Sequence, residues 1–101
     1  MIQSNIKAGV ERLKSFHQRD GGFGYWPGAE NADSWSTTYA GHFLVEAEKK
    51  GYLVPSDMLR KWKKYQRSKA QAWRRNQEAY SSELIQAYRL YSLALAGDPE
   101  L

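Results

Sequence analysis

Histidines are the first side chains to consider for chemistry, because they bind metals and transfer protons near neutral pH. The chain has two of them, His17 and His42. Neither belongs to an HExxH pattern, and neither is surrounded by carboxylates at the spacing of metal ligands. We therefore expect no metal site, and we interpret His42, which precedes Phe43 on an apolar helix, as a hydrogen-bonded core or rim residue.

Hydroxyls and carboxylates are the other groups that could act in catalysis. The hydroxyls gather at the start of a predicted helix, where capping and packing are the ordinary use of such side chains. No base that could activate one of them is identifiable, and no two carboxylates are spaced as a general acid and base. We expect no catalytic residue and no cofactor. The hydroxyls are Ser34, Ser36, Thr37 and Thr38, and the carboxylates are Asp20, Glu30, Asp33, Glu46 and Glu48.

Cysteine is absent from all 101 residues. This excludes disulfides, thiolate zinc sites, cysteine nucleophiles and an internal thioester within this stretch. No apolar run approaches the ~18 residues of a membrane span, and no basic stretch is followed by the apolar core of a signal peptide. We therefore expect the chain itself to be soluble and to carry no targeting segment.

Basic residues are concentrated between Arg60 and Arg75 and supply most of the net charge of +4. One interpretation is a face that binds anions such as DNA or anionic lipid, with an affinity that falls steeply with salt. The other is a solvated outer helix face, because Trp62 and Tyr65 fall on the predicted buried stripe of the same helix. We favour the solvated face and expect no nucleic-acid partner. The candidate anion-binding residues are Lys61, Lys64, Arg67 and Lys69.

Helices must position all of these groups, since the apolar residues recur with helical periodicity and no strand is required. A hydrophobic content of 42% and 14 aromatic residues argue for a folded chain of one domain or less. Helices backed by polar residues alternate with more apolar helices, which predicts two stacked hairpins in an outer and an inner layer, as in an α/α barrel or solenoid. The predicted helices span about residues 4–18, 35–50, 56–72 and 78–96.

The buried faces follow from the same periodicity. The helix at 56–72 has a single apolar stripe, whereas apolar residues surround most of the helix at 78–96, which we expect to be buried on several sides. For the helix at 35–50, small Ala40 and Gly41 permit close contact with another helix. Its predicted buried residues are Trp35, Tyr39, Phe43, Leu44 and Ala47.

The segment from Gln18 to Gly28 joins the first two predicted helices and combines glycines with aromatics. Glycine permits positive φ and close backbone approach, so a tight and specific corner is expected. Phe23, Tyr25 and Trp26 are too apolar to be left in water together, and we expect Trp26 to cover Gln18 while the amide of Gln18 bonds the next helix terminus. We interpret the corner as the closure of a hairpin rather than a ligand-binding loop.

The last residues carry a further helix signal. Gly97 ends one helix, and Asp98, Pro99 and Glu100 then supply an N-cap, a first-turn proline and a first-turn acid. We expect the chain to be a fragment of a longer helical array. Its isolated form should expose apolar faces meant for neighbouring hairpins and should self-associate through them.

The spacing of Gln18, Gly22 and Trp26 resembles the glutamine–tryptophan repeat of α/α toroids, the fold of terpenoid cyclases, protein prenyltransferase β subunits and the thioester-bearing domain of complement and α2-macroglobulin. Three longer strings, LKSFHQRDGGFGYWPG, WSTTYAGHFLVEAEKKGYLVP and QAYRLYSLALAGDPEL, look like the bacterial α2-macroglobulin-like proteins. The resemblance covers Leu13 to Leu101. It implies an all-α partial domain of two to three toroid hairpins, with a structural hairpin motif at Gln18, Asp20, Gly21, Gly22, Phe23, Gly24 and Trp26.

The resemblance also implies a parent protein that is periplasmic or bound to the cell envelope and traps attacking proteases. Its partners would be the remaining hairpins and domains of that parent and, through the full-length protein, the target proteases. Some members of the family carry a Cys–Gln thioester, from which this chain departs because it has no cysteine. An isoprenoid-handling toroid enzyme is the alternative, but the DxDD-like acidic cluster and the zinc-binding cysteine that such enzymes need are missing.

Overall fold

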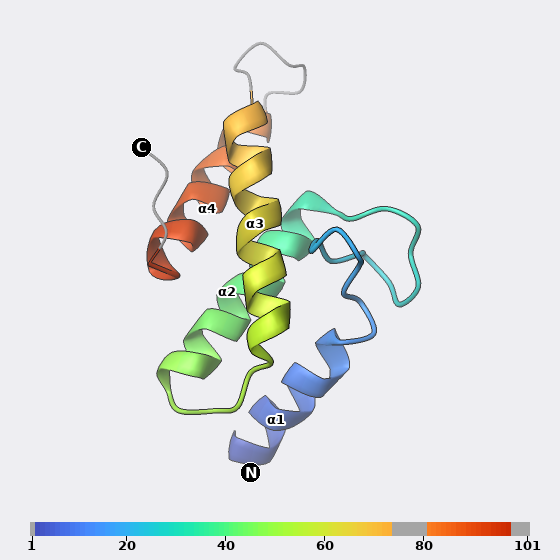
Figure 1. Ribbon diagram of the computed structural model, residues 1–101, viewed down its shortest axis with the longest axis vertical. Helices are drawn as coiled ribbons and strands as arrows, with labels where there is room; N and C mark the ends of the chain where they lie inside the picture. The colour runs from blue at the N-terminus through green and yellow to red at the C-terminus, as the bar shows by residue number, and fades with distance from the viewer. Residues whose placement is uncertain (1, 74–80, 98–101) are drawn as a thin grey trace.

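Four α-helices make up the regular structure in the computed structural model, which describes residues 2–73 and 81–97 (Figure 1). They are α1 (Ile2–Leu13), α2 (Ser34–Lys49), α3 (Ser56–Ala72) and α4 (Ser81–Leu95). Within these residues the chain is all-α, since its only β pairings are isolated bridges, His17 with Phe23 and Gly24 with Ala32. The predicted start of the fourth helix at 78, the basic residues Arg74 and Arg75, and the helix signal at 98–100 lie outside the described residues.

Local signals set the ends of α2. The Asp33 carboxylate accepts a hydrogen bond from the Ser36 amide at 2.9 Å, which caps the first turn. At the other end, Gly51 has φ +92°, and the Tyr52 amide donates to the carbonyl of Ala47 at 3.0 Å. A left-handed glycine after the last helical turn is the usual way in which such a helix ends.

The first helix is shorter than expected, because α1 ends at Leu13 and not near residue 18. Beyond Leu13 the amides of residues 14–17 donate to carbonyls three residues back, which makes tight turns in place of α-helix, and the chain then bonds to the corner. The Phe16 carbonyl accepts from the Gly24 amide at 2.9 Å, and the Gln18 amide donates to the Gly22 carbonyl at 2.9 Å. The prediction of a longer helix was wrong because apolar periodicity continues through Phe16, whereas the backbone bonds after Leu13 span three residues and not the four of an α-helix.

The core forms around Trp62 of α3, which is completely buried (0% exposed). Helix α2 lies at the centre of the fold and packs against α1, α3 and α4, and α3 also packs against α4. Figure 1 shows α3 crossing in front of α2, with α4 on one side and α1 below. The Trp62 indole donates to the Thr37 carbonyl at 2.8 Å, so the largest core side chain is also fully satisfied.

The face that α2 buries differs from the predicted one. Leu44 and Ala47 are buried as expected, and Phe43 is partly buried, but Trp35 and Tyr39 are exposed. Gly41 explains why a different face of α2 is buried, since a Cβ at this position would overlap the ring of Trp62. Helix α2 therefore presents its small residues to α3. The residues that it buries are Thr37, Thr38, Ala40, Gly41, Leu44, Val45 and Ala47.

Helix α4 is also less buried than its composition indicates. Leu93 is fully buried, whereas Leu84 and Tyr91 are exposed. A polar network occupies much of its contact with α3: the amide of Gln66 donates to Thr38 Oγ1 at 3.0 Å and to Ser92 Oγ at 3.3 Å. The sequence prediction counted apolar residues around the helix and missed this buried polar side.

Candidate interaction site

The corner between α1 and α2 is held by side chains of the predicted hairpin motif. Gln18 Nε2 donates to the carbonyl of Ala29 at 2.7 Å, which spans the corner rather than reaching a helix terminus. Asp20 Oδ1 accepts from the Gly22 amide at 3.0 Å. Gly22 and Gly24 are buried among these bonds. The motif residues therefore specify the backbone path of the corner.

Phe23 anchors this corner to α2. Its side chain is buried, its amide donates to Thr37 Oγ1 at 2.9 Å, and the Thr37 hydroxyl donates back to the Phe23 carbonyl at 3.1 Å. Gly21, with φ +99°, presses against α3, where an added Cβ would overlap the carbonyl of Lys61. The corner is thus a packed part of the fold between α2 and α3.

Trp26 and Tyr25 do not join the packing. Trp26 is 60% exposed and Tyr25 is 71% exposed, and their rings meet edge to face at 5.9 Å. The prediction that the three aromatics of the corner are shielded from water together was therefore wrong for Tyr25 and Trp26. Phe23 already fills the space against α2, and the chain turns outward after Gly24, so the next two aromatics lie on the surface.

Two titratable side chains flank the corner. Burial, and then the nearby Lys61 ammonium, lowers the pKa of His17 below its ordinary value. Burial, and then the Asp20 carboxylate, raises the pKa of Tyr65. Both groups are therefore held neutral near pH 7, and the centroids of the His17 and Phe23 rings lie 4.8 Å apart. This environment suits packing more than proton transfer.

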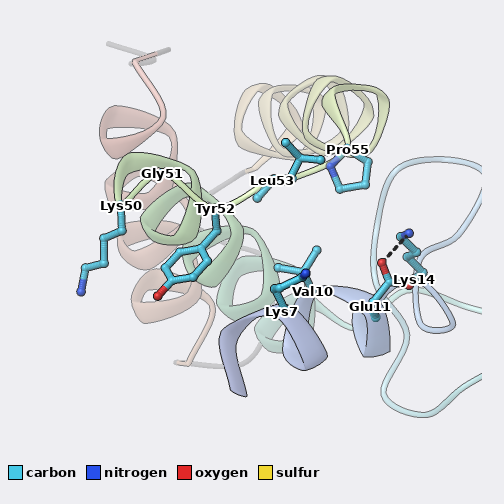
Figure 2. A pocket seen from close by; sticks show the side chains of 10 residues that line it. Lys7, Val10, Glu11, Lys14, Lys50, Gly51, Tyr52, Leu53 and Pro55 are labelled. Atoms are coloured by element: carbon cyan, nitrogen blue, oxygen red, sulfur yellow. Dashed lines mark hydrogen bonds and ion pairs between the residues drawn. The ribbon is translucent and has the colours of Figure 1, made fainter. Parts of the chain in front are cut away.

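A hollow of about 580 Å³ lies between α1 and the connection from α2 to α3 (Figure 2). Three of the residues that line it are lysines. Lys14 bonds the Glu11 carboxylate at 2.9 Å, and Figure 2 shows Lys14 and Lys50 at opposite ends of the hollow, with Tyr52 between them. The cations do not converge on one point, so the hollow lacks the arrangement that holds a phosphate.

Aromatic side chains of α2 and α4 form an exposed apolar surface. Tyr39, Tyr91 and Trp35 are 69%, 54% and 43% exposed, while Tyr88 and His42 lie half-buried between them. We call these five residues the aromatic face. At ~200 Å² per ring, the three exposed rings present roughly 330 Å², within the range of the largest apolar patch on a monomer.

Contacts within the aromatic face are specific. His42 Nδ1 lies 3.0 Å from the Tyr88 hydroxyl, and the rings of Trp35 and Tyr88 have centroids 5.6 Å apart. The His42 ring also meets that of Tyr91 edge to face at 5.8 Å. These contacts between α2 and α4 hold the rings of Trp35, His42, Tyr88 and Tyr91 together. A preordered aromatic surface loses little side-chain entropy when a partner covers it.

The candidate basic residues of α3 separate into two groups. Lys61 lies 3.4 Å from the Asp57 carboxylate, and Lys69 lies over the Tyr65 ring at 5.5 Å. Lys64 and Arg67 instead share a groove with Arg60 and Lys63. Arg60 and Lys63 were not among the candidate anion-binding residues chosen from the sequence. The spacing i, i+3, i+4 and i+7 from Arg60 nevertheless places all four residues on one side of a helix.

Among residues 2–73 and 81–97, no group of three or more His, Cys, Asp or Glu side chains could hold a metal ion. Among the same residues, every helix is too short or too polar to cross a membrane.

Similarity to a known protein is restricted to part of the chain. A stretch of 57 residues, or 56% of the chain, is 33% identical to a protein named alpha-2-macroglobulin from Escherichia coli strain K12. The match spans about 3% of that relative's length. No family model matches the chain, and no solved structure matches it. The stretch therefore has a local counterpart in one very much longer protein.

Proposed function

We propose that this chain is a piece of the helical domain of an α2-macroglobulin-like, protease-trapping protein of the cell envelope. The observation that carries the proposal is the 57-residue similarity to alpha-2-macroglobulin of E. coli. The glutamine–glycine–tryptophan spacing of the corner and the helical hairpins support it. The fold that we propose for this piece is two to three hairpins of an α/α toroid, in which α2 and α4 are the more apolar helices.

The role of this piece is structural and interactive, not catalytic. Its corner side chains are used in hydrogen bonds to the chain itself, as Gln18 to Ala29 and Thr37 to Phe23 show. Its aromatic face and the apolar groove beside Tyr39, between α1 and α2, are surfaces that another helix can cover. Because the matched stretch corresponds to about 3% of the relative's length, we assign those covering helices to the rest of the same polypeptide.

The proposal is tested on the complete reading frame that encodes this sequence. It should encode a much longer polypeptide, and that protein should block a protease from digesting a large protein substrate while leaving it active on a small peptide. A reading frame hardly longer than the present sequence would sink the proposal. So would a long protein that leaves digestion of the large substrate unchanged.

A further inference from the structure

Charge is distributed very unevenly along this chain. Helix α3 carries six Lys or Arg and one Asp in its 17 residues, a net charge of +5. The chain as a whole carries +4, so the other 84 residues together carry −1. A surface that serves only solubility mixes both signs. The positive charge is therefore concentrated on a single element.

Four of these cations share one side of α3. Arg60, Lys63, Lys64 and Arg67 line a groove of about 420 Å³ together with Leu59 and with Ser56 and Glu48 at the helix ends. We call these four residues the basic stripe. Its members stand at i, i+3, i+4 and i+7, so like charges are neighbours at every step. Such spacing weakens an isolated helix, and an external anion relieves the repulsion.

Contacts in the structure show what kind of anion suits this helix. Arg60 is already paired with the carboxylate of Asp57, one turn earlier, and Lys61 shares that carboxylate at 3.4 Å. A guanidinium binds a carboxylate through two parallel hydrogen bonds. The start of α3 thus contains an example of the pairing that Lys63 and Lys64 could make with the carboxylates of a partner.

We propose that the basic stripe is a docking site for an acidic helix of a protein partner, one whose Asp or Glu side chains recur at the same helical spacing. The stripe spans about 10.5 Å along the axis of α3, or two helical turns. Its cations line a groove that has α2 on the other side at Glu48, and a concave site receives a narrow rod better than a flat lipid surface. This inference does not depend on the proposed family.

The buried side of α3 supports a purely electrostatic contact. Met58, Leu59 and Trp62 are buried in the core, so this helix has no apolar face left to insert into a bilayer. The interaction should therefore be weakened by salt and should depend on the carboxylates of the partner.

The test uses the 101-residue chain and a labelled, Ala-rich synthetic peptide with Glu at i, i+3, i+4 and i+7, with binding followed by fluorescence anisotropy. We expect binding that weakens as salt is added. The double variant Lys63→Gln/Lys64→Gln should weaken it by about tenfold, since two exposed ion pairs are lost. Asp57→Asn should strengthen it, because it releases Arg60.

Matched controls separate the stripe from net charge. The variant Lys7→Gln/Lys50→Gln removes the same charge elsewhere and should leave binding within about twofold. Circular dichroism establishes that each variant keeps its helices. Equal binding of a peptide with Gln in place of Glu, or equal loss in the control variant, would overturn the proposal. So would binding to phosphatidylserine vesicles under conditions where the acidic peptide does not bind.

Discussion

Gly41 offers a test in which two physical effects have opposite signs. In the interior of a helix, Gly→Ala stabilises by about 1 kcal/mol through backbone entropy alone. In this fold, however, the new Cβ would overlap the Cε2, Cζ2 and Nε1 atoms of Trp62. Overpacking of a core costs about 1–3 kcal/mol, and a buried indole N–H that loses its acceptor costs a similar amount. We predict that Gly41→Ala destabilises the fold by about 3 kcal/mol.

Urea unfolding followed by far-UV circular dichroism measures this change. With a slope of about 1–3 kcal/mol/M, the midpoint should fall by roughly 1–3 M. Gly9→Ala is the matched control on α1, where the new Cβ would meet only the end of the half-buried Phe43 ring at 2.9 Å. Its effect should stay within about 1 kcal/mol.

A double-mutant cycle locates the cause of the Gly41 effect. Trp62→Phe removes the indole atoms nearest to the new Cβ, so the double variant should be more stable than the sum of the single changes implies. If Gly41→Ala instead raises the midpoint, or if the two changes are additive, then α2 and α3 do not pack in the way described.

Three further predictions follow from the corner and the aromatic face. Asp33→Ala removes the carboxylate that accepts from the Ser36 amide, and urea unfolding should show a loss of stability of about 1 kcal/mol. An unchanged midpoint would contradict a capping role for Asp33. The pKa of His17 is lowered in the fold by burial and then by Lys61, so the unfolded chain binds the proton more readily and stability should fall as the pH drops below 6.5. His17→Gln should reduce this loss of stability at low pH, measured against the unaltered chain. The same pH dependence in both proteins would contradict the lowered pKa of His17. Tyr39→Ser/Tyr91→Ser should reduce the self-association expected of the isolated chain, measured by sedimentation velocity, whereas Tyr25→Ser, which removes an exposed ring elsewhere, should not.

Signals close together in the sequence located α2 and α3 well. Asp33 before α2, Gly51 after it and Pro55 before α3 act within a single turn, so they can be read without knowing the rest of the fold. The end of α1 was missed because Phe16 continues the apolar period while its carbonyl bonds Gly24. Periodicity reports which side chains are apolar and not where the backbone bonds go.

Which face of α2 is buried depends on its partner. The sequence pattern assigned the large rings of Trp35 and Tyr39 to the core, but Trp62 of α3 needs the space that Gly41 leaves. That fit joins residues 21 positions apart in the chain and is not contained in the period of either helix. The aromatic face was therefore hidden from sequence reasoning, although the exposure of apolar surface in general was anticipated.

In the corner, the residue types indicate some of the contacts but not which aromatic side chain is buried. Gln18, Asp20 and Gly22 make local bonds that their residue types favour. Tyr25 and Trp26 were expected to be covered and are exposed. Composition can show that an aromatic residue is costly to expose, but it cannot show which of three adjacent rings occupies the space against α2.

Hydroxyl-radical footprinting of the aromatic face tests the central proposal most directly. Trp35, Tyr39 and Tyr91 should be oxidised readily in the isolated chain and protected in the full-length protein, where neighbouring helices would cover them. Buried Trp62 should be protected in both and serves as the internal reference. Equal oxidation of the three exposed rings in the two proteins would contradict the proposal that this chain is a piece of a larger helical domain.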